Sequence, residues 1–411
     1  MKFQNLRIER HDGKAWLKAD MECGFTPIKE LWFNVPDEYA DYLSDDIYDA
    51  VLVAALYPAM FYGEAIEIEG CVTEQLYRNI TAQITPIMES FSSSLHGVPI
   101  KVQGYATAAK NSKLHVGTGF SGGVDSFCTL QDHFFNESSD NYKVDTIFFF
   151  NIGQNGKYGE DSTIERTQNR YRRTADFSQK LSLPCIQMDC NLFSFYQPQW
   201  ELAAGALCRI MSVLVFQRAL KRYYISSAYT YDEMIHFGHK EIELASYADS
   251  LIISLLSPPG LDIVCDGVQY TRCEKTSNIA SSPLARQYLN VCVNYEPEFA
   301  NGKNCSRCSK CLRTLVALES LGLLEEFSQV FDMKVYRQYA YRYKCEQRLM
   351  YHENAFAHDN VDFAALNGHP FPSEKEARSY MRKLNHKKLS SRIKGKLKAS
   401  IRKAKSLITH S

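Results

Sequence analysis

Between residues 113 and 267, short apolar segments alternate with longer amphipathic ones. Five of the apolar segments have the length and composition of strands, and the most uniformly apolar of them is VDTIFFFNIG. Strands that are separated by helices of roughly ten to twenty residues form a parallel sheet with helices on both faces. Residues 113–270 are therefore predicted to form a doubly wound α/β domain with a five-stranded parallel sheet.

The regions on either side of this domain have different patterns. Residues 1–112 combine a hairpin pattern, LRIERHDGKAWLKADMEC, with further strands and two helices, and they predict a smaller N-terminal α+β domain. Residues 271–330 are expected to hold a cysteine-rich segment and a helix. Residues 331–411 are expected to form a helical extension that ends in a basic tail.

Composition narrows the class of protein. Hydrophobic residues make up 45% of the chain and charged residues 23%, which is typical of globular proteins. The longest apolar run, residues 48–62, contains a proline and is too short to cross a bilayer. The N-terminus has no export-signal pattern, and thirteen cysteines, an odd number, do not suit a disulfide framework. We therefore expect a cytoplasmic protein with reduced thiols.

The glycine-rich segment GTGFSGGVDSFCTL, residues 117–130, lies between the first strand and the first helix of the predicted α/β domain. Glycine-rich turns at this place commonly bind anions. A Walker loop needs a lysine after its last glycine, and none is present. Gly117, Gly119 and Gly122 match the dinucleotide-binding spacing, but that reading would start the helix at Gly122 and leave SGG unexplained.

The core of this segment has the chemistry of a phosphate site. Its two adjacent glycines let backbone N–H groups approach an anion, two serines add hydroxyl donors, and the following helix points its positive end at the same place. Asp125 would repel a phosphate unless Mg²⁺ lay between them. A magnesium-bridged phosphate is therefore the predicted ligand of Ser121, Gly122, Gly123, Val124, Asp125 and Ser126.

The motif SGGVDS after an apolar strand resembles the pyrophosphate loop of the N-type ATP pyrophosphatases. The resemblance implies an adenine nucleotide α-hydrolase-like fold. It also implies an enzyme that cleaves ATP between the α- and β-phosphates, adenylates a substrate oxygen and releases pyrophosphate. ATP and Mg²⁺ are the implied cofactors. By position, the adenine would lie against Phe150 and Asn151, and Ser226 and Ser227 would line the far side of the nucleotide pocket.

Few side chains are candidates for catalysis. The resemblance implies Ser121 and Asp125 from the loop. Lys275 and Arg313 are added because adenylyl transfer develops negative charge, which a cation would stabilise. Further candidates for acid–base or phosphate contacts, for which a solvated surface position is an equal alternative, are Asp189, His239 and Arg272.

Four cysteines form a second motif, Cys292, Cys305, Cys308 and Cys311, with the spacing C-x12-C-x2-C-x2-C. Four thiolates complete a tetrahedral zinc site, and two-residue spacings suit a tight knuckle at the start of a helix. We expect structural Zn²⁺, with an iron–sulfur cluster or packing and redox thiols as the alternatives. Cys273 is a possible substitute for Cys292.

Together, the loop and the cysteines about 170 residues later resemble the 7-cyano-7-deazaguanine synthase branch, which makes a nitrile in queuosine precursor synthesis. The resemblance covers roughly residues 113–325. The segment after the fourth strand, YTYDEMIHFGHKEIELASYADSL, departs from that enzyme's substrate-contacting segment. The resemblance therefore implies the ATP chemistry but leaves the deazaguanine substrate in doubt.

These features lead us to expect an ATP-dependent C–N ligase or amidating enzyme. It would activate a carboxylate or amide-like oxygen, of a small molecule or a protein, for attack by an amine or by ammonia. No glutaminase domain is recognisable, so ammonia would be free or come from a partner. The alternatives are a tRNA sulfur-transfer enzyme and a non-catalytic ATP-binding subunit of a defence or biosynthetic system.

The C-terminal tail, residues 377–411, has twelve Lys or Arg and no Asp or Glu. Its apolar residues form a rough helical stripe, so it would suit an anionic membrane surface or a nucleic acid, with a solubilising tail as the alternative. We also expect a homo-oligomer or a complex with the products of neighbouring genes.

Overall fold

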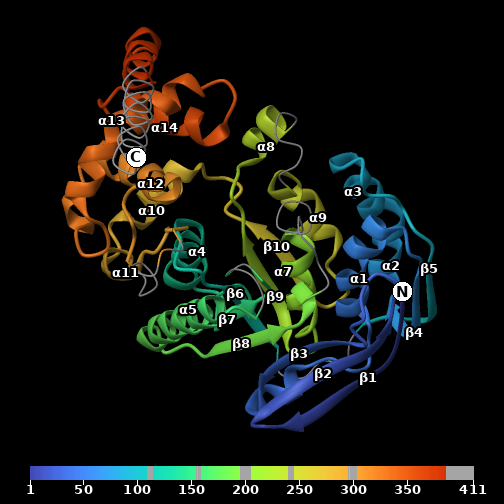
Figure 1. Ribbon diagram of the computed structural model, residues 1–411. Helices are drawn as coiled ribbons and strands as arrows, with labels where there is room; N and C mark the ends of the chain where they lie inside the picture. The colour runs from blue at the N-terminus through green and yellow to red at the C-terminus, as the bar shows by residue number, and fades with distance from the viewer. Residues whose placement is uncertain are drawn as a thin grey trace, which may run out of the picture.

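The computed structural model describes residues 1–108, 114–153, 155, 159–194, 205–238, 245–294, 296 and 303–385. Its strands form a single ten-stranded sheet in the order β10-β9-β6-β7-β8-β3-β2-β1-β4-β5 (Figure 1). Six of the nine pairings are parallel and three are antiparallel. The protein is therefore an α/β protein with a mixed, mostly parallel sheet.

One half of the sheet is the five-stranded parallel sheet that the sequence predicts. All four pairings in it are parallel. The chain runs from β6 outward to β7 and β8, then returns past β6 to β9 and β10. The strand order thus reverses at β6, where open α/β sheets bind ligands. The strands are β6 (His115–Gly119), β7 (Thr146–Asn151), β8 (Cys185–Cys190), β9 (Leu220–Ser226) and β10 (Asp262–Asp266).

The N-terminal strands continue the same sheet. β3 pairs antiparallel with β8 through Phe33 opposite Cys190, so the sheet has twice the number of strands predicted for the α/β domain alone. Asp12 (φ 55°) and Gly13 (φ 70°) form the tight turn of the predicted hairpin. The strands are β1 (Lys2–His11), β2 (Lys14–Glu22), β3 (Glu30–Pro36), β4 (Ile66–Thr73) and β5 (Ile100–Ala106).

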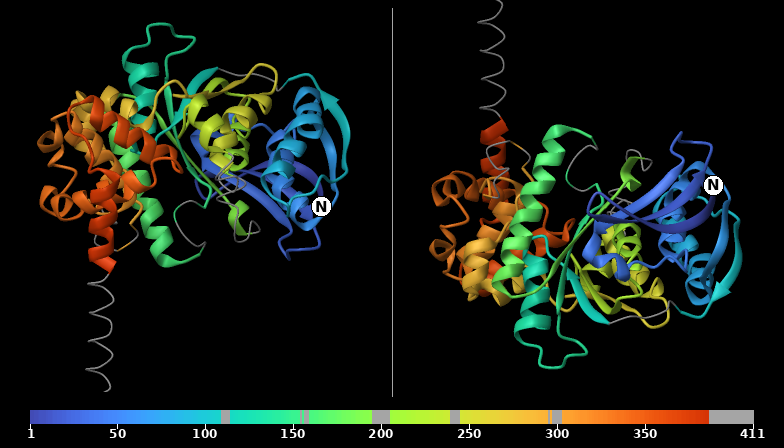
Figure 2. Two further views of the ribbon diagram at one scale, coloured as in Figure 1. Left: turned by 90° about the horizontal axis from the view of Figure 1, so that it is seen from above. Right: turned by 90° about the horizontal axis from the view of Figure 1, so that it is seen from below.

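Helices cover both faces of the sheet, and a hydrophobic core lies under each set. One core joins the N-terminal strands to α1, α7 and α9. The other joins β6 and β7 to α4, α5 and the C-terminal helices. Figure 2 shows the C-terminal helices and the N-terminal strands at opposite ends of the molecule.

The helices near the sheet are α1 (Asp49–Tyr62), α2 (Glu74–Asn79), α3 (Thr85–Phe91), α4 (Val124–Leu130), α5 (Asp161–Lys180), α7 (Gly205–Leu214), α8 (Tyr231–Phe237) and α9 (Asp249–Leu255). The C-terminal helices are α10 (Arg272–Ala280), α11 (Pro283–Tyr288), α12 (Ser309–Ser320), α13 (Met333–Leu349) and α14 (Ala355–Leu366). No helix in the described ranges is long and apolar enough to span a bilayer.

Two boundaries differ from the sequence pattern. The sequence suggests one helix over residues 200–222, whereas α7 ends at Leu214 and β9 already begins at Leu220. The residues between them, 215–219, form tight turns. In these turns the Val215 N–H donates to the Met211 carbonyl, and the Ala219 N–H donates to the Phe216 carbonyl. Most of the basic tail, residues 386–411, lies outside the described residues.

Candidate functional site

The SGGVDS loop lies where the strand order reverses, between the end of β6 at Gly119 and the start of α4 at Val124. Gly122 has a φ of +75°, a conformation that L side chains rarely adopt. Gly123 is the extended residue that caps α4, and its carbonyl accepts a hydrogen bond from Ser126 Oγ at 3.0 Å. The helix continues past Leu130 as a π turn over Gln131–Phe135. The loop therefore has the backbone of an anion-binding turn before a helix.

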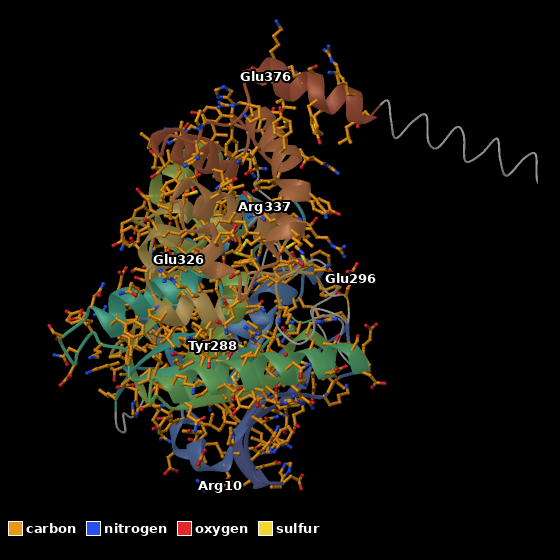
Figure 3. All side chains as sticks on the ribbon, turned by 90° about the vertical axis from the view of Figure 1, so that its left-hand side faces the viewer. Arg10, Tyr288, Glu296, Glu326, Arg337 and Glu376 are labelled. Atoms are coloured by element: carbon orange, nitrogen blue, oxygen red, sulfur yellow. The ribbon has the colours of Figure 1, made fainter. Side chains whose placement is uncertain are left out.

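A cavity of about 500 Å³ opens in front of this loop. Its wall comes from the loop, the ends of β7 and β9, the helices α5, α7, α10 and α12, and the segment 288–294. Tyr288 and Glu296, labelled in Figure 3, belong to this wall. The volume is within the range usual for sites of small molecules.

The wall is strongly basic. Among the described residues, it has seven basic side chains and two acidic ones, Asp125 and Glu296. Burial lowers the pKa of Arg313, and Lys310, although accessible to solvent, has its pKa lowered by the surrounding protein and by Arg272. Such a concentration of positive charge favours a polyanionic ligand. The basic residues are Arg166, Arg170, Arg173, Arg209, Arg272, Lys310 and Arg313.

Four of these arginines were not identified from the sequence: Arg209 on α7, and Arg166, Arg170 and Arg173 on α5. The three on α5 are spaced so that they lie on one side of the helix. Arg170 donates to the Asn155 side chain at 2.8 Å, and Arg173 donates to the Tyr288 carbonyl at 3.2 Å. The arginine spacing in the sequence could have indicated a basic helix face, but only the fold shows that it points at the loop.

Asp125 has a cationic side chain near each carboxylate oxygen, but only one of the two oxygens is in close contact. Its Oδ2 pairs with Arg272 at 2.9 Å, and its Oδ1 lies 3.8 Å from Lys275 Nζ. This Oδ1 is buried and has no hydrogen-bond partner among the described residues. A buried, unsatisfied carboxylate oxygen is a suitable ligand for a hard cation. The site is thus compatible with the predicted Mg²⁺.

Lys275 takes a different position from the predicted one against a substrate phosphate. It is 1% exposed, lies behind Asp125, and donates from Nζ to the Ser227 carbonyl at 2.7 Å. Ser227 is itself fully buried, and its hydroxyl donates to the Tyr229 carbonyl. Lys275 thus links the Ser227 carbonyl to Asp125 of the loop, and neither Lys275 nor Ser227 lines the cavity.

Some of the other predicted site residues line the cavity, and others do not. Arg313 enters the wall from α12, and its guanidinium stacks 3.4 Å from the Phe356 ring of α14. Phe150 and Ser226 also line the cavity. Asn151 instead donates to Asp189 Oδ1 at 3.0 Å. His239 lies outside the described residues.

Ser226 belongs to a buried polar chain that the sequence did not indicate. Thr129 Oγ1 donates to Asp266 Oδ2 at 2.6 Å, and Ser226 Oγ lies 2.9 Å from the same Thr129 oxygen. His133 Nε2 lies 2.8 Å from the other Asp266 oxygen. Although burial opposes it, the hydrogen bond with His133 lowers the pKa of Asp266, so the carboxylate form is favoured. Because Thr129 donates to Asp266, Ser226 must donate to Thr129, which leaves its lone pairs for a ligand donor.

The four predicted cysteines do form a cluster, and its Sγ atoms all lie within 4.8 Å of one another. Neighbouring Sγ atoms are 4.0 Å apart for Cys292 and Cys308, 3.9 Å for Cys305 and Cys311, and 3.4 Å for Cys308 and Cys311. A tetrahedral zinc site with Zn–S distances of about 2.3 Å places its sulfur atoms about 3.8 Å apart. The cluster could therefore bind a zinc ion.

Backbone N–H groups also point at the cluster. Asn294 and Cys305 donate to Cys292 Sγ at 3.3 and 3.4 Å, and Cys308 donates to Cys305 Sγ at 3.3 Å. Such contacts stabilise thiolates and orient metal ligands. Cys273 lies apart, where Asn360 donates to its Sγ, so Cys292 is the fourth member.

Comparison of this chain with protein-family models, with curated proteins and with solved structures found no match. Functional inference therefore depends on the site itself.

Proposed function

We propose that this protein is an ATP-dependent adenylating enzyme of the N-type ATP pyrophosphatase kind, which cleaves ATP to AMP and pyrophosphate. The observation that carries this proposal is the SGGVDS loop at the reversal of strand order, facing a cavity to which the described part of the chain contributes seven basic side chains. A loop with a φ of +75° at Gly122, followed by a helix, supports the binding of a polyphosphate. The half-buried Asp125 supports a magnesium-bridged one.

In this proposal, the residues of the cavity wall have different roles. The loop N–H groups and the α5 arginines would hold the β- and γ-phosphates, which leave as pyrophosphate. Bound Mg²⁺ would neutralise charge on the phosphate oxygens. Lys275 and Arg272 would hold Asp125 in position. Lys310 and Arg313 face the same cavity from α12 and would stabilise negative charge on the α-phosphate side as the adenylate forms.

In this proposal, zinc has a structural role. The four-cysteine cluster would leave no open coordination position for a substrate, which is typical of structural sites. Cys308 caps α12, and Lys310 and Arg313 follow in its first turns. A metal at the cluster would therefore hold the start of the helix that carries both cations.

In the second half of the proposed reaction, a nitrogen nucleophile attacks the carbon that carries the adenylated carboxylate or amide-like oxygen. The C–N bond forms, and the C–O bond breaks as AMP leaves with that oxygen, as in a 7-cyano-7-deazaguanine synthase-like ligase. Ser226 supports an N–H donor in the cavity, because its own proton is used by Thr129.

Two alternative functions make different predictions. A tRNA sulfur-transfer enzyme would bind tRNA in a salt-sensitive way, and a non-catalytic subunit would bind ATP without turnover.

Product analysis tests the proposal. Purified protein with MgATP and pooled candidate carboxylates and amines should form AMP and pyrophosphate, and Asp125→Asn should lower the rate by at least about a hundredfold, as is common for a group that stabilises transition-state charge. Asp41→Asn, at an exposed position of the N-terminal region outside the cavity wall, is the matched control and should keep the wild-type rate. Formation of ADP and phosphate, or an unchanged rate in Asp125→Asn, would contradict the proposal.

A further inference from the structure

The segment 288–292 connects the pyrophosphate loop to the cysteine cluster. The Asn290 N–H donates to the Gly122 carbonyl at 2.7 Å, and a Cβ at Gly122 would lie 3.6 Å from Asn290 Cβ and from the Tyr288 carbonyl. Two residues later, Cys292 belongs both to the cluster and to the cavity wall. One short segment of backbone thus contacts the loop glycine, Gly122, and carries a cysteine of the cluster, Cys292.

Asn304 holds this segment from the other side. Its Oδ1 accepts from the N–H groups of Val291 at 2.8 Å and Cys292 at 3.1 Å. Its Nδ2 donates to the carbonyls of Leu289 at 2.9 Å and Val330 at 3.0 Å. All four hydrogen-bonding positions of the amide are therefore used. The side chain is 4% exposed, and the next residue is Cys305, which belongs to the cluster.

We propose that Asn304 is a positioning residue that couples metal occupancy of the cysteine cluster to the shape of the pyrophosphate loop. The proposal rests on the proposed function, since it takes the loop as a pyrophosphate site. A metal that binds Cys292 and Cys305 fixes the two ends of the Asn304 clamp relative to each other. Segment 289–292 then presents the Asn290 N–H to Gly122. Without the metal these ends are joined only by hydrogen bonds, from the Cys305 N–H to Cys292 Sγ and from the Cys292 N–H to Asn304 Oδ1, so the clamp is held less tightly.

The physical consequence is a reciprocal effect between two ligands that do not touch. If zinc favours the loop conformation that binds pyrophosphate, pyrophosphate must favour zinc binding by the same factor. Coupling free energies between sites commonly change affinity about 5- to 150-fold. If zinc only held the start of α12 in place, replacing Asn304 would not change how zinc and pyrophosphate affect each other's binding.

The first experiment uses the wild-type protein. The zinc affinity is measured by equilibrium competition with a chelating dye, with and without magnesium pyrophosphate, and pyrophosphate binding is measured separately by calorimetry. We expect pyrophosphate to raise the zinc affinity about tenfold or more. Bound pyrophosphate that leaves the zinc affinity unchanged would overturn this inference alone. Failure of the wild-type protein to bind pyrophosphate would overturn the proposed function as well.

The second experiment uses Asn304→Ala with Asn191→Ala as its control. Asn191 is also buried, accepts from the Trp32 N–H and donates to the Glu30 carbonyl, but it joins β8 to the N-terminal strands. We expect Asn304→Ala to bind pyrophosphate about tenfold more weakly and to bind zinc with an affinity that pyrophosphate no longer changes. Asn191→Ala should keep the coupling even if it unfolds more easily. Equal coupling in the two variants would overturn the role of Asn304.

Discussion

Gly122 gives a prediction whose magnitude follows from the structure. Its φ of +75° costs an L residue about 1–2 kcal/mol. A Cβ at this position would meet nothing closer than 3.6 Å, so Gly122→Ala adds backbone strain but no steric overlap. The substitution should therefore cost about 1–2 kcal/mol in total.

This cost can appear in two measurements. If the loop of Gly122→Ala keeps its conformation, the free energy of unfolding falls by about 1–2 kcal/mol. If the loop relaxes, pyrophosphate binding must restore the strained conformation, and the affinity falls about 5- to 30-fold. Urea unfolding measures the loss of stability, and calorimetric titration with magnesium pyrophosphate measures the loss of binding free energy. The two losses should add up to about 1–2 kcal/mol.

Gly322→Ala is the matched control. Gly322 has a φ of +71°, has no atom within 4 Å of its missing Cβ, and follows α12 outside the cavity wall. It should lose the same stability and bind pyrophosphate with wild-type affinity. If Gly122→Ala matched the wild type in both stability and affinity, the assigned loop conformation would be wrong.

Three further predictions concern buried groups. Cys308→Ser should lose the metal that plasma emission spectroscopy finds in the wild type, whereas Cys273→Ser should retain it. Lys275→Met should lower the free energy of unfolding by about 1.5–3 kcal/mol in urea, because the buried Ser227 carbonyl loses a charged hydrogen-bond donor and Asp125 keeps only Arg272 as counter-charge; a loss below about 0.5 kcal/mol would exclude this role. Burial raises the pKa of Asp49 from 3.8 to about 6. Its stabilisation is therefore present below pH 4 and is lost as the pH rises towards 6, a fall of roughly 3 kcal/mol that should be absent in Asp49→Asn.

Local signals in the sequence identified most of the elements. The Asp12-Gly13 turn, the apolar run of β7 and the SGG turn before α4 each depend on neighbouring residues, so their conformations follow from local physics. The cysteine spacing also sufficed to identify the cluster, since three of its members fall within one turn and the start of one helix.

Long-range features could not be predicted in this way. The junction of β3 with β8 pairs Phe33 with Cys190, residues more than a hundred positions apart, and no local pattern specifies that partner. The α5 arginines face the loop only because α5 packs on the same face of the sheet as α4. Asn304, between two expected metal ligands, had the pattern of a turn residue, and its four hydrogen bonds appear only in the folded chain.

Cleavage of ATP between its α- and β-phosphates is the central claim. It is tested most directly by incubating α-³²P-labelled ATP and Mg²⁺ with the purified protein and a small-molecule extract of cells, and separating the labelled products. We expect labelled AMP or an AMP adduct from the wild-type protein, and neither from Asp125→Asn. Labelled ADP as the product would contradict it.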